Sequence, residues 1–267
     1  MRLILTGATG SAGGEVLRQA LVDPRVTAVT VLSRRPLPAY LVPDPPPSKL
    51  RVTLHDSFEA YPAALLDSLK GYDACIWALG TTSNGKSEPE YERVTRTYAV
   101  EAAKAFSTLK PTGVGDDERR DAGTNAKFVF AYISGLGADQ EKRGWTSTMF
   151  GRIKGQTERD LSLVPALAAY SFRPGFIVPT VVPPPAYRST YNTPFYQGLG
   201  NLVSRASDSM AIRGDLLAKA LIEVCLQGGR PGGLGEGWDA KGRTGNDGVF
   251  ENREALKIAR DGARSTL

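Results

Sequence analysis

Three glycines at three-residue intervals, Gly7, Gly10 and Gly13, constrain the fold of this chain more than any other feature. The apolar residues 3–5 precede them, and residues 16–21 follow with apolar side chains at helical spacing. In a turn between a strand and a helix, glycines let the backbone approach a ligand, and N–H groups at the helix N-terminus can bind a pyrophosphate. The flanking strand and helix favour this interpretation over a glycine-rich turn that binds nothing. The residues predicted to bind the cofactor at this turn are Thr6, Gly7, Gly10, Ser11, Ala12 and Gly13.

The length and composition are those of a globular protein. The 267 residues are enough for one large α/β domain, or for a nucleotide-binding domain with a small cap. The chain has 33 Lys and Arg residues against 28 Asp and Glu residues, and the net charge of +5 is spread along it. This argues against a nucleic-acid partner, which needs clustered basic and aromatic residues. Cys75 and Cys225 are far apart, so neither a metal site nor a disulfide framework is expected.

The sequence also predicts no membrane-spanning or targeting segment. No stretch of about 18 apolar residues occurs, so no transmembrane segment is predicted. The first predicted strand begins within three residues of Met1, which leaves no room for a signal or transit peptide. On these grounds we expect a cytoplasmic protein.

Apolar, β-branched segments alternate with segments of helical periodicity. Strands are predicted at residues 3–5, 27–32, 50–54, 74–79, 127–133 and 169–172, and helices at residues 61–70, 88–109 and 152–163. Nearly continuous apolar strands that alternate with helices are typical of a parallel sheet covered on both faces. The sequence therefore predicts an α/β fold with a doubly wound, Rossmann-type parallel sheet, whose ligands bind at the carboxyl ends of the strands.

The sequence changes character after residue 175, where prolines and aromatic residues become frequent. We interpret residues 1–175 as the dinucleotide-binding core, and residues 176–267 as a substrate-covering part integrated with it in one domain. In this second part, helices are predicted at residues 198–206 and 215–226, and a last strand and helix at residues 249–260. The proline-rich residues 36–47 and the polar residues 110–126 are interpreted as surface loops without an assigned function.

Six short segments together resemble the extended and atypical short-chain dehydrogenases/reductases. They are TGATGSAGGEV, VLSRRP, ALGTT, YISGLGAD, GRIKGQTERDL and SFRPGFIV, and they follow one another in the order of that superfamily. Within it, the chain is similar to the small NAD(P)H-binding oxidoreductases of the Tat-interacting-protein-like group. That group includes a branch associated with the mitochondrial outer membrane, so peripheral attachment to this membrane is the alternative to a cytoplasmic location.

The end of the second predicted strand bears on the choice of cofactor. NAD-binding sites place an Asp or Glu there, which accepts a hydrogen bond from the ribose 2′-hydroxyl. This chain has Ser33, Arg34 and Arg35 instead. A guanidinium can pair with a 2′-phosphate, so the sequence predicts NADP(H), and the alternative is an exposed basic turn. The resemblance implies further cofactor contacts from Asp56, Leu79, Gly80, Thr81 and Pro174.

The resemblance also implies a catalytic set. Related reductases use a Ser after the fifth strand to orient the substrate, and a Tyr-x-x-x-Lys pair on the next helix for proton transfer and ribose binding. Ser134 and Lys154 match the Ser and the Lys, but Phe150 occupies the place of the Tyr. A phenyl ring has no ionisable proton, and losing a positioned acid typically lowers the rate by about 10²–10⁴.

Three hypotheses follow from the missing phenol. Another side chain serves as the donor, with Tyr132 as the first candidate and Ser147 or Thr148 as others, although Tyr132 also suits a core aromatic and Thr148 a helix cap. Alternatively, the substrate needs no protonation by the protein, as in the reduction of an iminium ion or a non-redox isomerisation or cyclisation. In the third hypothesis the protein binds NADPH without turnover, as a regulatory protein.

The candidate substrate pocket is rich in aromatic residues: Trp145, Phe150, Phe176, Tyr191 and Tyr196. Residues 178–196 occupy the place where such folds cover the substrate, although a loosely packed loop with exposed aromatics is an equal alternative. We therefore expect hydride transfer between NADP(H) and a small organic carbonyl, alcohol or imine that is bulky or apolar. A monomer or homodimer is expected.

Overall fold

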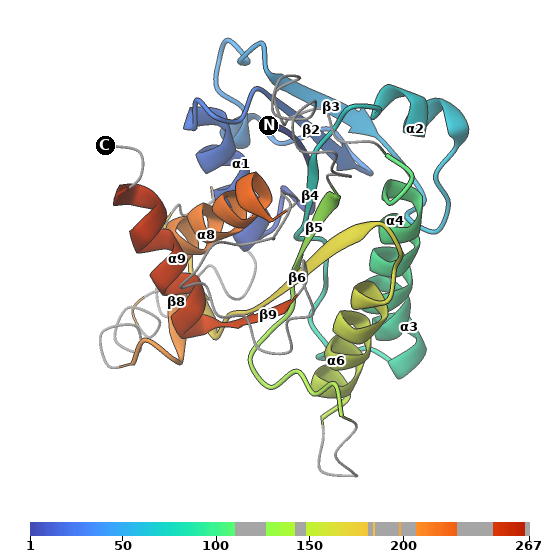
Figure 1. Cartoon of the computed structure of the whole chain (residues 1–267), viewed down its shortest axis with the longest axis vertical. Coiled ribbons are helices and arrows are strands. Elements are labelled where there is room, and N and C mark those ends of the chain that lie inside the picture. Colours follow the sequence, from blue (N-terminus) through green and yellow to red (C-terminus); the bar gives the residue numbers. More distant parts are fainter. Residues whose placement is uncertain are drawn as a thin grey trace, which may run out of the picture.

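The computed structural model describes residues 1–109, 127–141, 148–180, 184, 198, 207–228 and 248–264. Within them, one parallel sheet has the strand order β3-β2-β1-β4-β5-β6-β9. Its strands are β1 (Arg2–Thr6), β2 (Ala28–Ser33), β3 (Leu50–Leu54), β4 (Ala74–Trp77), β5 (Phe128–Ile133), β6 (Leu167–Arg173) and β9 (Gly248–Glu251). The strand order reverses direction between β1 and β4, so the predicted doubly wound, Rossmann-type fold is confirmed (Figure 1).

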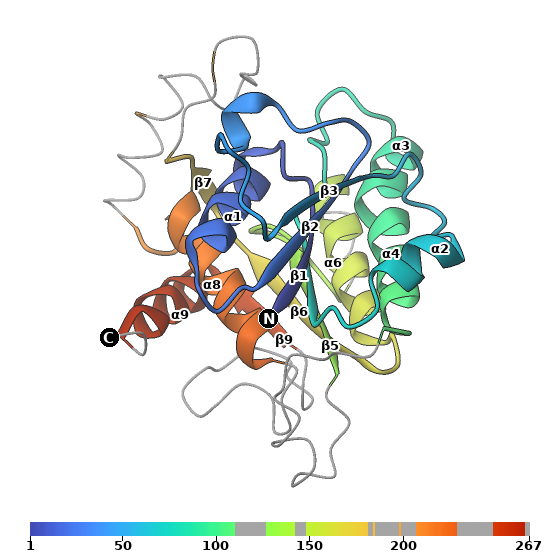
Figure 2. The same ribbon diagram turned by 90° about the horizontal axis from the view of Figure 1, so that it is seen from above.

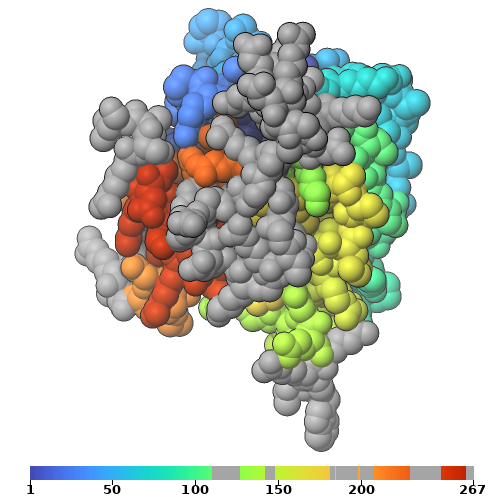
Figure 3. Space-filling view, viewed as in Figure 1, coloured from blue at the N-terminus to red at the C-terminus, as the bar shows by residue number. Residues whose placement is uncertain are grey.

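Helices cover both faces of the sheet (Figures 1 and 2). One face carries α1 (Ser11–Val22), α8 (Gly214–Gln227) and α9 (Asn252–Arg264). The other carries α2 (Ala63–Ser68), α3 (Glu88–Glu92), the π-helical turn η2 (Arg93–Thr97), α4 (Tyr98–Phe106) and α6 (Met149–Ser162). The space-filling view shows α9 in red and α6 in yellow on opposite sides of the molecule (Figure 3). A short 3₁₀ turn, η1 (Ala39–Leu41), lies between β2 and β3.

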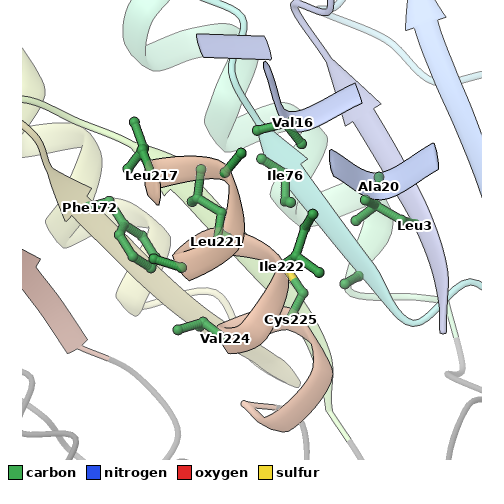
Figure 4. Close-up of a cluster of buried hydrophobic side chains, with 14 of the residues drawn as sticks. Leu3, Val16, Ala20, Ile76, Phe172, Leu217, Leu221, Ile222, Val224 and Cys225 are labelled. Carbon is green, nitrogen blue, oxygen red and sulfur yellow. The ribbon is translucent and has the colours of Figure 1, made fainter. Parts of the chain in front are cut away.

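The alternation of side chains along each strand divides the interior into two cores. On β5, Val129 and Ala131 belong to the core beneath α1 and α8, whereas Phe128, Phe130 and Tyr132 belong to the core beneath α4 and α6. Figure 4 shows the first core, in which side chains of α8 pack between the sheet and α1. Each large apolar side chain buried in this way contributes roughly 1.5–3 kcal/mol. Because both faces are buried, the strands are apolar almost throughout, which is the pattern that the sequence displays.

The structure differs from the sequence-based prediction at two helices and in one pair of strands. The predicted helix 88–109 is interrupted by η2, and α6 begins at Met149 because Thr148 caps it, its Oγ1 accepting a hydrogen bond from Gly151 N at 3.1 Å. The predicted helix 198–206 lies outside the described residues except for position 198. A separate parallel pair, β7 (Phe176–Val178) and β8 (Ala211–Arg213), was not predicted.

Asn252 joins the β7–β8 pair to the main sheet. It is the first residue of α9 and follows β9 directly. Its buried side chain accepts a hydrogen bond from Gly175 N at 2.9 Å and donates to the carbonyl oxygens of Asp208 and Ala211, each at 2.8 Å. One side-chain amide thereby satisfies three backbone groups at the end of the β7–β8 pair where both strands begin.

Glu15 ties the same pair to α1. Its carboxylate is buried and accepts hydrogen bonds from Thr180 N at 2.7 Å and Thr180 Oγ1 at 2.6 Å. The helix that follows the glycine turn is therefore fixed to the segment that leaves β7. Among the described residues, no helix is both long enough and apolar enough to span a bilayer.

Candidate functional site

The glycine turn connects β1 to α1 and packs tightly on the start of the loop after β4. Gly7 has a φ of +68°, and a Cβ there would lie 2.4 Å from the carbonyl oxygen of Ala78. A Cβ on Gly13 would lie 2.1 Å from the carbonyl oxygen of Gly7. At Gly10, by contrast, the same carbonyl oxygen of Gly7 is 3.3 Å away and the residue is exposed. Gly7 and Gly13 therefore permit the turn itself, and Gly10 leaves its outer surface open to a ligand.

A cleft of about 720 Å³ lies against this turn. It lies at the carboxyl ends of β2 and β4, where a doubly wound sheet binds its ligand. Its lining residues are Gly7, Ala8, Thr9, Gly10, Leu32, Ser33, Arg34, Arg35, Pro36, Leu37, Pro38, Ala39, Phe58, Ala78, Leu79 and Gly80. The set contains two arginines and no acidic residue, so the cleft suits an anionic ligand. A glycine turn at a helix N-terminus and two guanidinium groups supply N–H donors of the kind that bind phosphate groups.

The two arginines are available for such a ligand. Arg34 and Arg35 are exposed, and neither forms an ion pair within the described part of the chain. Ser33 Oγ accepts a hydrogen bond from Arg35 N at 3.4 Å, which closes the turn after β2. The structure thus places all three residues of the predicted phosphate-binding group at one cleft.

The other cofactor residues predicted from the sequence are distributed unevenly. Leu79 and Gly80 line the cleft, and Thr6 Oγ1 accepts a hydrogen bond from Leu79 N at 3.4 Å. Thr81 is half-buried and follows Gly80, outside the set of lining residues. Asp56 is exposed beyond β3 and is not part of the lining either. Ser11 and Ala12 form the first turn of α1.

The start of the proline-rich segment also belongs to the cleft, although the sequence predicts only a surface loop there. Residues 36–39 line the cleft directly after the two arginines. Their position in the sequence, immediately after Ser33, Arg34 and Arg35, is the signal that could have placed them there.

Ser134 and Lys154 lie together at the carboxyl end of β5. Ser134 is buried, with 6% of its surface exposed, and its N–H donates to the carbonyl oxygen of Phe172 at 2.7 Å. Its Oγ has no hydrogen-bond partner among the described residues. Lys154 Nζ donates to the carbonyl oxygen of Ile133, the residue before Ser134, at 2.8 Å. A buried hydroxyl without a partner next to a buried ammonium is an arrangement that a polar ligand would complete.

The lysine ammonium lies in an environment of low polarity. Lys154 is 8% exposed, and its Nζ lies 4.7 Å from the centroid of the Tyr132 ring. Burial lowers the pKa of Lys154 to about 8, and the nearby Glu158 carboxylate opposes this shift only in part. The group therefore titrates close to neutral pH.

Phe150 lies on the first turn of α6, against the residue that follows Ser134. A Cβ on Gly135 would lie 2.6 Å from Cζ of the Phe150 ring, so the tip of the ring is covered by the Gly135 backbone. The ring centroid also lies 6.5 Å from that of Tyr91 in α3. The residue at the place of the usual tyrosine is thus a packed apolar ring.

Two of the alternative proton donors have structural roles instead. Tyr132 is 1% exposed, its hydroxyl donates to the carbonyl oxygen of Thr95 at 3.4 Å, and burial raises its pKa well above the usual value. This is the placement of a core aromatic, so the prediction of Tyr132 as the donor is not supported by its geometry. Thr148 is the cap of α6, and Ser147 lies outside the described residues.

Of the residues predicted to line a substrate pocket, Phe150 and Phe176 are among the described residues. Pro174 is buried, and its carbonyl oxygen accepts from Leu136 N at 2.8 Å; Phe176 is half-buried, and its N–H donates to the carbonyl oxygen of Met210 at 2.7 Å. Leu136 and Met210 are 49% and 55% exposed. The remaining candidates, Trp145, Tyr191 and Tyr196, lie outside the described residues.

Solved structures with nicotinamide cofactors have the same fold. The WbmF enzyme of Bordetella bronchiseptica in complex with NAD⁺ matches all of this chain and 79% of its own, at a TM-score of 0.58 and 12% identity. The UDP-glucuronic acid 4-epimerase of Bacillus cereus in complex with NAD matches 85% of this chain and 74% of its own, at 0.57 and 14%. The chain has the Rossmann-type fold that these two enzymes share. The fold that the sequence predicts is thereby confirmed. The reductase domain of PhqB from Penicillium fellutanum has the same fold, at a TM-score of 0.56 and 18% identity over 83% of this chain and 63% of its own.

Curated relatives come from fungi. "Protein fmp52, mitochondrial" of Aspergillus clavatus is 28% identical over 240 residues, which are 88% of this chain and 92% of the relative. The protein of the same name in Aspergillus fumigatus is 31% identical over 176 residues, 65% of each chain. "Leucinostatins biosynthesis cluster protein T" of Purpureocillium lilacinum is 32% identical over 134 residues, and the match spans half of this chain and 42% of that protein. No protein-family model matches the chain.

Proposed function

We propose that the protein is an NADP(H)-dependent oxidoreductase of the atypical short-chain type, acting on a small organic carbonyl, alcohol or imine. The observation that carries this proposal is the cleft in which the glycine turn lies together with Arg34 and Arg35, which form no ion pair with another described residue, and whose described lining contains no acidic residue. Ser134 and Lys154 lie at the carboxyl end of β5, on the same edge of the sheet as this cleft. The solved structures with bound NAD support one part of the proposal, namely that this fold binds a nicotinamide nucleotide.

Each residue has a distinct role in this proposal. A reduced nicotinamide supplies hydride when it is bound. Gly10 leaves room for the pyrophosphate, and Arg34 and Arg35 pair with the 2′-phosphate. Lys154 donates a hydrogen bond to the ribose, and Ser134 Oγ donates to the oxygen or nitrogen of the substrate, which satisfies its buried hydroxyl.

Replacing both arginines by alanine tests the cofactor assignment. We expect Arg34→Ala/Arg35→Ala to weaken NADPH binding by about tenfold or more, because charge-assisted hydrogen bonds each contribute about 1.5–3 kcal/mol. NADH, which has no 2′-phosphate, should bind equally well to both proteins. The measurement is the Kd of each nucleotide by calorimetry. Arg51→Ala is the control, because Arg51 is exposed on β3 outside the cleft; tighter binding of NADH than NADPH by the native protein contradicts the assignment.

The identity of the substrate is proposed from the apolar residues near Ser134. Exposed Leu136 and Met210 and half-buried Phe150 and Phe176 lie around the ends of β5 to β7, which favours a bulky or apolar substrate. We expect the native protein to oxidise NADPH with a panel of apolar aldehydes, ketones and cyclic imines, followed by the absorbance of NADPH.

Tyr191 and Tyr196 are proposed to complete this pocket. Replacing both by alanine should raise the KM for an apolar substrate about tenfold, because each removes a large contact area, and leave the Kd of NADPH unchanged. A KM equal to that of the native protein would remove these residues from the proposal.

A second candidate function is supported by Phe150. Its packed ring removes the usual acid, so a protein that binds NADPH without turnover, acting as a regulator, is the alternative. The same substrate panel distinguishes the two functions, because a regulator binds NADPH and oxidises none of it.

The cellular location belongs to the proposal as well. The fungal relatives named fmp52 are called mitochondrial. We propose peripheral association with the mitochondrion over a cytoplasmic location. Fractionation of cells that express the full chain with a carboxyl-terminal tag tests this, with release by carbonate expected for a peripheral protein.

A further inference from the structure

The proton source is the missing part of the proposed reaction, and the described residues near Ser134 narrow the choice. Phe150 has no acidic proton, and the tip of its ring is covered by Gly135. The hydroxyl of Tyr132 points to the carbonyl oxygen of Thr95 in η2. One buried group that does carry transferable protons at this strand end is the ammonium of Lys154.

Lys154 Nζ has hydrogen-bonding capacity to spare. An ammonium carries three N–H donors, and one of them is used by the carbonyl oxygen of Ile133 at 2.8 Å. The ring of Tyr132 lies to one side of Nζ. No described carboxylate lies within ion-pair distance of Nζ, so two donors remain for a ligand beside Ser134.

The nearest carboxylate is held by other partners. Glu158, one turn further along α6, accepts from Arg173 Nε at 2.9 Å and Arg173 Nη2 at 2.5 Å, and from Gln140 Nε2 at 2.9 Å. Arg173 of β6 thereby competes with Lys154 for this charge. The groups facing Lys154 are then Tyr132 of β5, Glu158 of α6 and, through Glu158, Arg173 of β6. Among the described residues, no carboxylate therefore forms an ion pair with this buried ammonium, which makes it a better acid than an exposed lysine.

We propose that Lys154 is itself the catalytic acid, donating a proton from Nζ to the substrate; this inference rests on the function proposed above. Hydride from NADPH bonds to the carbon of the C=O or C=N group, whose π electron pair moves to oxygen or nitrogen. That atom takes the proton from Nζ while Ser134 Oγ donates a hydrogen bond to it. The substrate gains two electrons, NADPH becomes NADP⁺, and neutral Lys154 is reprotonated by solvent. A single residue thus combines ribose binding with the acid function that the sequence assigned to another side chain.

Tyr91 is the alternative candidate for the catalytic acid. Its hydroxyl is buried and has no hydrogen-bond partner among the described residues, and its ring lies beside Phe150. Burial also raises the pKa of Tyr91, which makes the phenol a weaker acid at neutral pH. Tyr91→Phe removes only this hydroxyl and therefore provides a matched variant.

The pH dependence of the native protein gives the first readout. An acid must be protonated to act, so kcat at saturating NADPH should be constant below the pKa of about 8 and fall tenfold per pH unit above it. Lysine carbon NMR gives a readout that needs no turnover. The one signal that is missing in Lys154→Arg should titrate with a midpoint near pH 8, and a midpoint close to that of an exposed lysine overturns the proposal.

Variants separate acid catalysis from ribose binding. Lys154→Arg keeps a positive charge that does not release a proton near neutral pH, so kcat should fall by about 10²-fold or more while the Kd of NADPH stays within about threefold. Lys154→Ala should recover activity when small primary ammonium ions are added, and Tyr91→Phe should retain the native pH profile.

The outcomes distinguish this proposal from the function on which it rests. Two results would show that Lys154 is not the acid while the oxidoreductase function stands. In the first, the native protein oxidises NADPH and Lys154→Arg has the same kcat. In the second, Tyr91→Phe abolishes turnover and ammonium ions do not restore the activity of Lys154→Ala. If the native protein binds NADPH and oxidises none with any substrate, the proposed function fails and the role of Lys154 fails with it.

Discussion

Replacing Gly13 by alanine is expected to destabilise the whole protein and to abolish nucleotide binding. The added Cβ would lie 2.1 Å from the carbonyl oxygen of Gly7, and two backbone segments, unlike a flexible side chain, cannot yield cheaply. Overpacking typically costs about 1–3 kcal/mol, and a contact with rigid backbone lies at the upper end of this range. Thermal unfolding should show a fall in Tm of roughly 10 °C, or the variant should fail to accumulate in soluble form.

Gly10→Ala is the matched control for this prediction. Gly10 has φ −81° and ψ 166°, a conformation open to any residue, and an added Cβ would meet only the Gly7 carbonyl oxygen at 3.3 Å. We expect a Tm close to that of the native protein but a marked loss of NADPH affinity, because the new methyl group occupies the surface of the cleft. Native affinity in Gly10→Ala would show that the pyrophosphate does not lie on this turn.

Breaking the buried ion pair between α6 and β6 should have the second large effect. The Glu158 carboxylate is fully buried, and Arg173 binds it through two nitrogens. Arg173→Met leaves this charge without its partner in the interior, which typically costs about 3–5 kcal/mol. Chemical denaturation should give a correspondingly lower free energy of unfolding, and the pKa of Lys154 should rise because Glu158 becomes available to its ammonium.

An exposed pair on the same helix provides the comparison. Arg152 binds Glu88 through two nitrogens at 2.7 and 2.9 Å, but both side chains are substantially exposed. Surface pairs contribute about 0–1 kcal/mol, so Arg152→Met should leave the free energy of unfolding almost unchanged. Equal losses in the two variants would mean that burial does not determine the contribution of the Arg173–Glu158 pair.

The sheet was predictable because its strands are buried on both faces. Such strands are continuous apolar segments between helices, and the bounds of β2, β3 and β5 agree with the prediction within one residue. The β7–β8 pair was not predictable, because each strand has only three residues and the two strands are more than thirty residues apart along the chain. Their pairing depends on Asn252, which a local pattern cannot show.

The interruption of the helix before β5 shows the same limit. Residues 88–109 have helical periodicity throughout, but the π-helical turn η2 lies within them. The carbonyl oxygen of Thr95 accepts from Tyr132, and Arg96 pairs with Asp160 of α6. These contacts come from other elements, so local propensity does not contain them.

The candidate site was predictable where chemistry follows spacing. The glycine turn, the arginines after β2 and the pair Ser134 and Lys154 lie where the pattern indicated. The hydrogen-bond partners and the packing of each group were not predictable. Only the structure shows that Ser134 Oγ lacks a described partner, that Glu158 is bound to Arg173, and that Gly135 covers the tip of Phe150.

The hydrogen bonds of Asn252 have a consequence for synthesis on the ribosome. Gly175, which precedes β7, and the segment around β8 are both fixed by this one side chain, which follows the last strand of the sheet. The first six strands can assemble as soon as they emerge, but Phe176 and its neighbours acquire their final positions only after residue 252 has left the exit tunnel. Nascent chains arrested before that point should therefore have the first six strands assembled, while β7 and β8 have not yet acquired their final positions.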